Sequence, residues 1–191
     1  MKKVAVMLDD GFEEIEALTV VDIIRRANIT CDMFSVSSME VKGAHDIVVK
    51  ADKLISEEVK EYDVIVLPGG MPGATNLRDN EEVIDLVKWF NDNKKIVAAI
   101  CAAPIVLGKA GIIEGKKVTS YPGFEDELVK GSYLEEHVVV DGNIITSRGP
   151  ATAMLFAYKI LELLQCDKWE NIRVLRAEIT SIIEMNTTSD E

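Results

Sequence analysis

The sequence predicts a doubly wound α/β sandwich with a mainly parallel sheet. Two observations lead to this fold class. Short apolar runs rich in β-branched residues alternate along the chain with amphipathic segments of helical period. No linker, internal repeat or low-complexity segment interrupts this alternation in the 191 residues. We therefore expect residues 1–185 to form a single domain and residues 186–191 to form a frayed C-terminal tail.

Strands are expected where short uncharged runs of β-branched residues occur. The predicted strands are Val4–Leu8, Cys31–Val36, Asp63–Leu67 and Ile96–Ile100, with shorter ones at Ile47–Val49 and Val118–Ser120. A later segment, His137–Ser147, alternates between polar and apolar residues around Asp141-Gly142, which predicts a hairpin.

Helices are expected between these strands, where apolar residues recur every three or four positions. The predicted helices are Phe12–Ala27, Lys53–Lys60, Glu81–Asn91, a segment that begins near Pro104, Gly123–Lys130, Pro150–Leu164 and Lys168–Met185. Proline suits the first turn of a helix because its missing N–H would be unpaired there.

The composition argues against several classes of function. A net charge of −12 disfavours binding to nucleic acid or to an anionic membrane. No run is long and uncharged enough to span a bilayer, and the apolar stretch after Met1 is too short for a signal peptide. The three cysteines, Cys31, Cys101 and Cys166, are far apart and odd in number, so no disulfide framework is expected. These features predict a cytoplasmic protein with reduced thiols.

Cys101 is the most informative residue, because it lies between the predicted strand Ile96–Ile100 and the helix that begins near Pro104. A thiol on such a turn faces the N-terminus of the helix, which predicts a lowered thiol pKa and a nucleophile elbow. The alternative is that Cys101 is a buried, inert hydrophobic residue, which is the usual role of a lone cysteine near a core strand. Cys31 and Cys166 are expected to be packing residues.

Two further loops are expected to lie near Cys101. In a doubly wound sheet, sites form at the carboxyl ends of the strands, and the loops Asp9–Glu16 and Pro68–Gly73 both follow predicted strands. The N–H groups at Gly69-Gly70, together with that of Ala102, could bind a developing oxyanion. An ordinary tight turn is the alternative for the glycine pair.

Acidic residues crowd the start of the first helix. Glu13, Glu14 and Glu16 could simply favour the positive end of the helix dipole. Glu16 also shares an apolar stripe with Val20 and Ile23, and a desolvated carboxyl has a raised pKa that suits proton transfer. Glu13 also lies near apolar positions, so periodicity alone does not choose between them.

Other polar residues have simpler interpretations. Arg26 follows Asp22 by four residues, which predicts a surface ion pair. Arg148 and Pro150 lie where a strand ends and a helix begins, and Arg148 could hold an acidic ligand or a partner subunit. His45 and His137 show no spacing typical of metal ligands, so no metal site is expected.

Four motifs that occur in order along nearly the whole chain resemble the ThiJ/PfpI superfamily, and most closely the clade of the parkinsonism-associated deglycase. The resemblance implies a flavodoxin-like (class I glutamine amidotransferase-like) sandwich, usually a homodimer with the active site close to the dimer contact. The motifs are Gly11-Phe12-Glu13-Glu14-Ile15-Glu16, Val66-Leu67-Pro68-Gly69-Gly70, Ala98-Ala99-Ile100-Cys101-Ala102-Ala103-Pro104 and Thr146-Ser147-Arg148-Gly149-Pro150.

The resemblance also implies roles for individual residues. Cys101 resembles the nucleophilic, oxidation-prone cysteine of the family, and Glu16 the protonated carboxyl that hydrogen-bonds to it. The other residues expected at the site or at a dimer contact are the backbone donors Gly70 and Ala102, together with Gly69, Arg26, Arg148 and Pro150.

The implied function is that of a cofactor-free glyoxalase III-type enzyme or protein deglycase that acts on methylglyoxal-type carbonyls or early glycation adducts. The alternative is a non-enzymatic oxidative-stress sensor or redox-regulated chaperone that uses Cys101. Peptidase activity is disfavoured because Ala102 stands where the peptidase branch has histidine, and no His-x-Glu typical of glutamine amidotransferases is present. The clade also has a site histidine in the loop before the late hairpin. Its position aligns with the Lys130–Ser132 stretch here, not clearly with His137.

Overall fold

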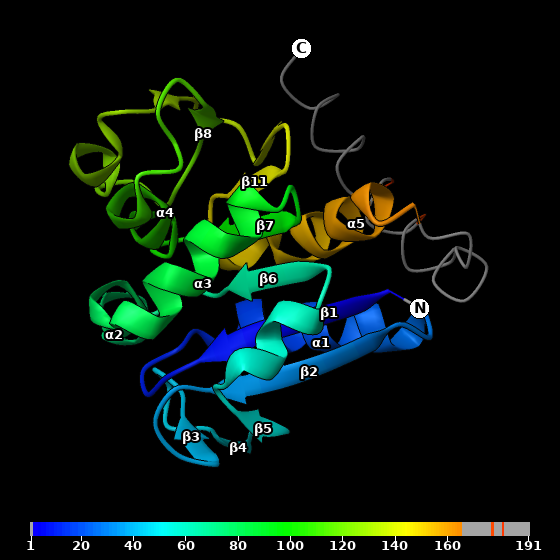
Figure 1. Ribbon diagram of the computed structural model, residues 1–191. Coiled ribbons are helices and arrows are strands. Elements are labelled where there is room, and N and C mark those ends of the chain that lie inside the picture. Colours follow the sequence, from blue (N-terminus) through cyan, green and yellow to red (C-terminus); the bar gives the residue numbers. More distant parts are fainter. Residues whose placement is uncertain (1, 166–176, 178–180, 182–191) are drawn as a thin grey trace.

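A seven-stranded, mainly parallel sheet forms the centre of the molecule (Figure 1). The computed structural model describes residues 2–165 together with residues 177 and 181. The strand order is β10-β11-β7-β6-β1-β2-β5, and only β10 and β11 pair in antiparallel fashion. The strands are β1 (Lys3–Leu8), β2 (Thr30–Ser35), β5 (Lys53–Leu54), β6 (Val64–Leu67), β7 (Ile96–Ile100), β10 (Val138–Asp141) and β11 (Ile144–Ser147). This topology confirms the predicted flavodoxin-like fold.

Helices cover both faces of this sheet (Figure 1). The helices α1 (Glu14–Arg26) and α5 (Ala153–Leu163) pack together on one face. The other face is covered by α2 (Gly73–Asp79), α3 (Glu81–Asp92) and α4 (Pro104–Ala110). Because both faces are covered, the central strands are apolar throughout, and β6 is buried at every residue.

Side chains of β1 divide between the two halves of the core. Val4 and Val6 pack with α1 and α5, whereas Ala5 and Met7 pack with the helices of the opposite face. This division follows from the two-residue period of a strand. The parallel pairing of β1 with β6 and of β6 with β7 places the carboxyl ends of these strands at the same edge of the sheet, where their loops meet.

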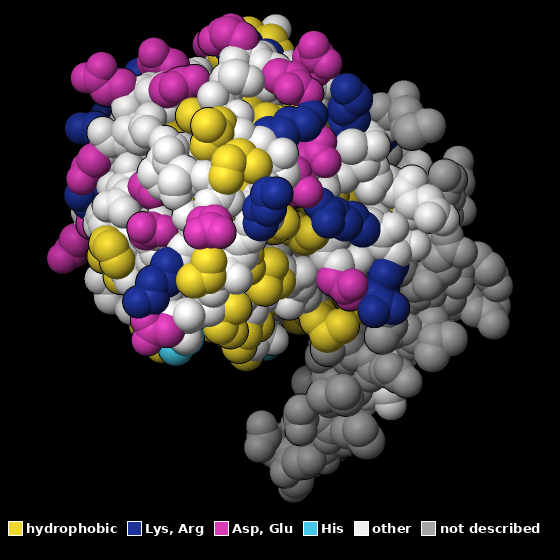
Figure 2. All heavy atoms as spheres, turned by 90° about the horizontal axis from the view of Figure 1, so that it is seen from below, with side chains coloured by type: hydrophobic (Ala, Val, Ile, Leu, Met, Phe, Trp, Pro, Cys, Tyr) yellow, Lys and Arg dark blue, Asp and Glu magenta, His cyan; other side chains and the backbone are white. Residues whose placement is uncertain are grey.

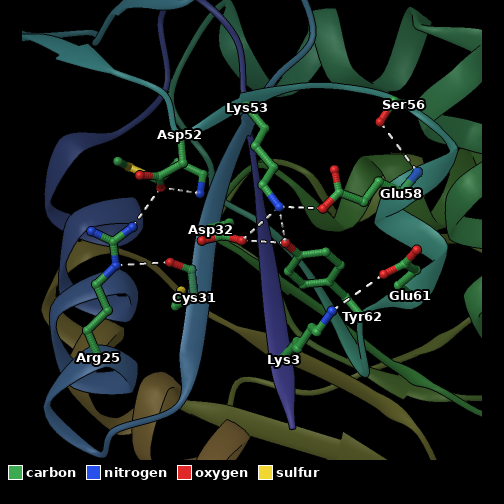
Figure 3. Close-up of polar contacts among 11 residues, drawn as sticks. Lys3, Arg25, Cys31, Asp32, Asp52, Lys53, Ser56, Glu58, Glu61 and Tyr62 are labelled. Carbon is green, nitrogen blue, oxygen red and sulfur yellow. Dashed lines mark hydrogen bonds and ion pairs between the residues drawn. The ribbon is translucent and has the colours of Figure 1, made fainter. Parts of the chain in front are cut away.

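The predicted helix over Lys53–Lys60 is wrong. Lys53 and Leu54 form the edge strand β5 beside β2, and a short 3₁₀ helix, η1 (Glu57–Glu61), follows. Strand pairing outweighs the local helical period there, and the Lys53 ammonium lies 3.0 Å from the hydroxyl of Tyr62 (Figure 3). Asp32 accepts a hydrogen bond from that hydroxyl, which ties β2 to the start of β6.

Several smaller elements also differ from expectation. The predicted helix Gly123–Lys130 is the 3₁₀ helix η2 (Glu125–Leu128), and α2 was not predicted. Pro150 begins the 3₁₀ turn η3 (Pro150–Thr152), which leads into α5. Two further strand pairs are β3 (Glu40–Lys42) with β4 (Val48–Lys50), and β8 (Lys117–Val118) with β9 (Ser132–Tyr133).

Three of the predictions at the C-terminus lie outside the described residues, apart from Ala177 and Ser181, which are helical. They are the helix Lys168–Met185, the tail 186–191 and the packing role of Cys166. Within the described part of the chain, every helix is too short or too polar to cross a bilayer.

Candidate active site

Cys101 lies on the tight turn between β7 and α4. Its φ of +65° is in the left-handed region, which is uncommon for a residue with a side chain. Two backbone hydrogen bonds hold this turn: the Cys101 N–H donates to the carbonyl of Ser147 at 2.9 Å, and its carbonyl accepts from the N–H of Tyr121, also at 2.9 Å. The strand-to-helix turn therefore has the geometry of a nucleophile elbow, and Cys101 is partly exposed.

Glu16 supplies a buried carboxyl next to this sulfur. The residue has 0% of its surface exposed, and its Oε2 accepts a hydrogen bond from the N–H of Gly69 at 2.7 Å. The carboxyl also interacts with the Cys101 thiol, and Oε1 has no hydrogen-bond partner within the described part of the chain. Burial raises the pKa of Glu16 to about 7, against the lowering effect of these hydrogen bonds.

The structure therefore selects Glu16 over Glu13, a choice that periodicity left open. The side chain of Glu13 is 12% exposed and points toward His45, 3.6 Å from the ring Nδ1. One helical turn separates the two carboxyls, but only that of Glu16 interacts with Cys101.

The expected lowering of the Cys101 pKa is wrong. Burial and the negative charge of Glu16 raise the thiol pKa, and they outweigh the backbone N–H groups of Ala102 and Gly70 that act on the sulfur in the opposite sense. From the sequence, the position of Cys101 on the turn showed only the backbone dipoles that stabilise a thiolate. The carboxyl of Glu16, which opposes them, comes from a distant segment. The thiol and the carboxyl thus resist losing both protons, and a thiolate forms most readily when Glu16 carries the proton.

Gly69 and Gly70 allow the loops to approach closely. A Cβ on Gly69 would lie 2.6 Å from Cβ of Cys101 and 2.7 Å from Oε2 of Glu16. Gly70 has a φ of +89°, and a Cβ there would lie 2.3 Å from the backbone nitrogen of Glu13. The glycine pair is therefore required by packing against the site. The N–H of Gly69 donates to the Glu16 carboxyl, and the N–H of Gly70 acts on the Cys101 sulfur.

The remaining predicted residues divide into two groups. Arg26 is exposed in the last turn of α1, paired with Asp22 at 2.6 Å, and lies about 15 Å further along the helix axis than Glu16. Within the chain it is not part of this site. Arg148 and Pro150 line an open pocket of about 320 Å³ next to the Cys101 turn. Their functional roles stay predictions.

Sequence reasoning missed the contacts of His45. Its ring Nδ1 lies 2.9 Å from Oε2 of Glu14, and its backbone N–H donates a hydrogen bond to Oε1 of Glu14 at 2.8 Å. The carboxylates of Glu13 and Glu14 and the His45 ring offer ligand atoms within 4.8 Å of one another. The ion pair with Glu14 accounts for this cluster. No spacing in the sequence indicates it, because a loop brings His45 to the start of α1.

Comparison with known proteins identifies the family of the chain. The model of the DJ-1/PfpI family matches residues 2–163. The chain belongs to this family. Protein dj-1beta of Drosophila melanogaster is 41% identical over 167 residues, which span 85% of this chain and 89% of that protein. The crystal structure of Drosophila DJ-1beta has a TM-score of 0.86 and 37% identity, covering 94% of this chain and 97% of that one.

Two other DJ-1 proteins extend the comparison. The chain is 38% identical over 163 residues to DJ-1 homolog B of Arabidopsis thaliana; the match covers 84% of this chain but only 37% of that longer protein. A structure of oxidized Toxoplasma gondii DJ-1 has a TM-score of 0.85 and 38% identity, and covers 94% of this chain and 98% of that one. The DJ-1/PfpI match includes all the loops that meet at Cys101.

Proposed function

We propose that this DJ-1/PfpI protein is a cofactor-free, cysteine-dependent glyoxalase III-type enzyme or protein deglycase. Its substrates would be methylglyoxal-type carbonyls or early glycation adducts. The observation that carries the proposal is the pairing of the Cys101 thiol with the fully buried carboxyl of Glu16. A carboxyl with a pKa of about 7 exchanges its proton readily near neutral pH.

The pair supplies the groups that this reaction needs. The sulfur of Cys101 adds to the aldehyde carbon of methylglyoxal, and the thiol proton passes through Glu16 to the aldehyde oxygen, giving a hemithioacetal. Glu16 then removes the proton from that carbon and returns it to the neighbouring ketone carbon. The hydroxyl proton of the hemithioacetal passes to the ketone oxygen, so the first carbon becomes a carbonyl and the second carries a hydroxyl. The product is a thioester of lactate, which water cleaves to lactate and the free thiol.

Backbone N–H donors are placed to stabilise the negative charges that form during this reaction. The N–H groups of Gly70 and Ala102 flank the sulfur, where they would stabilise the thiolate and the oxyanion that forms beside it. Oxidation at the aldehyde carbon is balanced by reduction at the ketone carbon, so the reaction needs no external oxidant or cofactor.

The decisive experiment follows lactate formation from methylglyoxal by the purified protein. We expect turnover by the wild type and none by Cys101→Ser, whereas Cys31→Ser, a change at a buried cysteine, serves as the matched control. Lactate formation that does not require the Cys101 thiol, or no lactate formation at all, would refute the proposed enzyme activity. Release of a preformed arginine adduct, after free aldehyde has been removed, separates deglycase activity from consumption of the aldehyde.

An oxidative-stress sensor is the second candidate. It is supported by the same donors around the sulfur of a partly exposed cysteine and by the oxidized state in which the Toxoplasma gondii relative was solved. A protonated Glu16 would donate to a sulfinate at Cys101. Intact-protein mass spectrometry during peroxide titration tests this role, and oxidation of other cysteines before Cys101 would count against it.

A homodimer in the cytoplasm completes the proposal. The exposed apolar residues Ile15, Ile47 and Val48 lie on segments that the contact between Glu14 and His45 brings together. Figure 2 shows hydrophobic side chains gathered between charged ones on one face of the molecule. Light scattering of the wild type and of Ile15→Glu tests for a dimer, which the charged variant is expected to weaken. A reactive thiol favours a reducing compartment.

A further inference from the structure

The pocket beside Cys101 has an unusual charge for this chain. The chain has 33 acidic and 21 basic residues, yet none of the described residues that line this pocket of about 320 Å³ is acidic. The lining consists of Tyr121, Pro122, His137, Arg148, Gly149, Pro150, Ala151 and Thr152. In a protein with a net charge of −12, the absence of carboxylates from this lining removes the repulsion that an anionic ligand would meet elsewhere on the surface.

Arg148 provides the positive charge of this pocket. Its side chain makes no hydrogen bond or ion pair with the described residues, and its Nη1 is itself buried. A guanidinium that has no carboxylate partner and lines an open pocket favours an anionic ligand in that pocket. A carboxylate matches the planar guanidinium best.

Gly149 connects the pocket to the reactive sulfur. A Cβ at this residue would lie 4.0 Å from Sγ of Cys101 and 3.0 Å from the ring of Tyr121. With glycine there, no side chain of residue 149 separates the sulfur from the pocket. A short molecule could therefore reach Cys101 at one end and Arg148 at the other.

We propose that the preferred substrates are 2-oxoaldehydes that carry a carboxylate on a short chain, with the carboxylate bound by Arg148 and the aldehyde at Cys101. This inference rests on the proposed function and specifies its substrate class. With 4,5-dioxopentanoate and water the product is 2-hydroxyglutarate: the aldehyde carbon is oxidised to a carboxyl, and the ketone carbon is reduced to a secondary alcohol. Atoms and electrons balance without a further reactant.

The kinetic test compares 4,5-dioxopentanoate with 2-oxopentanal, a neutral analogue that lacks the carboxylate. We expect the ratio of their kcat/KM values to fall at least tenfold in Arg148→Gln, as loss of a charged hydrogen bond predicts. Arg148→Lys should restore part of the ratio. Arg78→Gln, a change to an arginine paired with Asp79 and Glu127 outside this pocket, should leave the ratio as in the wild type. An equal loss for both substrates in Arg148→Gln would overturn the proposal.

A second measurement does not depend on turnover. Iodoacetate and iodoacetamide alkylate the same thiol but differ in charge, so the ratio of their rates at Cys101 reports whether an anion is directed to the sulfur. We expect Arg148→Gln to lower this ratio by at least several-fold relative to the wild type and to Arg78→Gln. An unchanged ratio would refute the anion site, whereas a lowered ratio without turnover would refute only the proposed enzyme.

Discussion

Glu16 and Cys101 interact at the edge of the sheet, although they belong to segments far apart in the sequence. Glu16 projects from the first turns of α1, and Cys101 lies on the turn after β7. The Gly69 N–H, 2.7 Å from Oε2 of Glu16, fixes the carboxyl in this position. A proton donor that is buried, oriented and in contact with a thiol is the arrangement on which the chemistry of this site depends.

Replacing Glu16 by glutamine is expected to change how stability depends on pH. The pKa of Glu16 is about 7 in the folded protein and 4.5 as its ordinary value, so its contribution is fully present below pH 4.5 and is lost as pH rises through 7. The wild type should therefore lose on the order of 3 kcal/mol of unfolding free energy, relative to Glu16→Gln, across this range. Urea denaturation of both proteins from pH 4.5 to 8 measures the difference. Parallel curves would contradict the buried, protonated carboxyl.

Replacing Gly69 by alanine is expected to disrupt the site. The new Cβ would lie 2.6 Å from Cβ of Cys101, 2.7 Å from Oε2 of Glu16 and 3.0 Å from the nitrogen of Ala102. We expect a loss of about 1–3 kcal/mol in stability and a changed rate of Cys101 alkylation. The control is Gly111→Ala, where φ is +75° but no atom lies within 4 Å of the added carbon. It should lower stability through the backbone alone, by about 1 kcal/mol, with alkylation as in the wild type.

The two described cysteines are expected to differ in reactivity. Burial raises the pKa of both thiols, so access of the reagent decides the difference: Cys31 is only 2% exposed, whereas Cys101 is partly exposed. Treatment of the native protein with iodoacetamide at pH 8, followed by peptide mapping, should modify Cys101 at least tenfold faster than Cys31. Both should react in denaturant. Preferential modification of Cys31 in the native protein would contradict the structure.

The ion pair between His45 and Glu14 is expected to respond to pH in a defined window. The hydrogen bond that the ring donates to Glu14 and the charge of Glu13 raise the His45 pKa above 6.5, so the stability gained from protonated His45 is present below pH 6.5 and lost as pH rises through the folded value. Burial opposes ionisation of Glu14, but hydrogen bonds from His45 outweigh it and hold the Glu14 pKa below 4.5. The pair is therefore most effective between pH 4.5 and 6.5.

An NMR titration of the His45 ring measures this coupling. The midpoint should lie above 6.5 in the wild type and return toward 6.5 in Glu14→Gln. A midpoint that does not change on this substitution would show that the contact is absent in solution.

Local patterns predicted the main strands and the long helices well. The apolar runs that became β1, β6 and β7 are buried on both faces, so their sequences carry the strand signal without interruption. In the segment Lys53–Lys60 the helical period gave a wrong prediction, because pairing with the edge of β2 decides the conformation of Lys53 and Leu54. A short helix such as α2 carries too few residues for a clear period.

The sequence by itself determined the fold class, the turn that carries Cys101 and the glycines that follow β6. These features depend on neighbouring residues, which the sequence displays directly. Only the tertiary structure decided that Glu16 rather than Glu13 meets the sulfur, that the thiol pKa is raised, and that Arg148 lines the adjoining pocket. Each of these depends on burial and on contacts between distant segments. Solvent exclusion and charge proximity arise only when the sheet brings its loops to one edge.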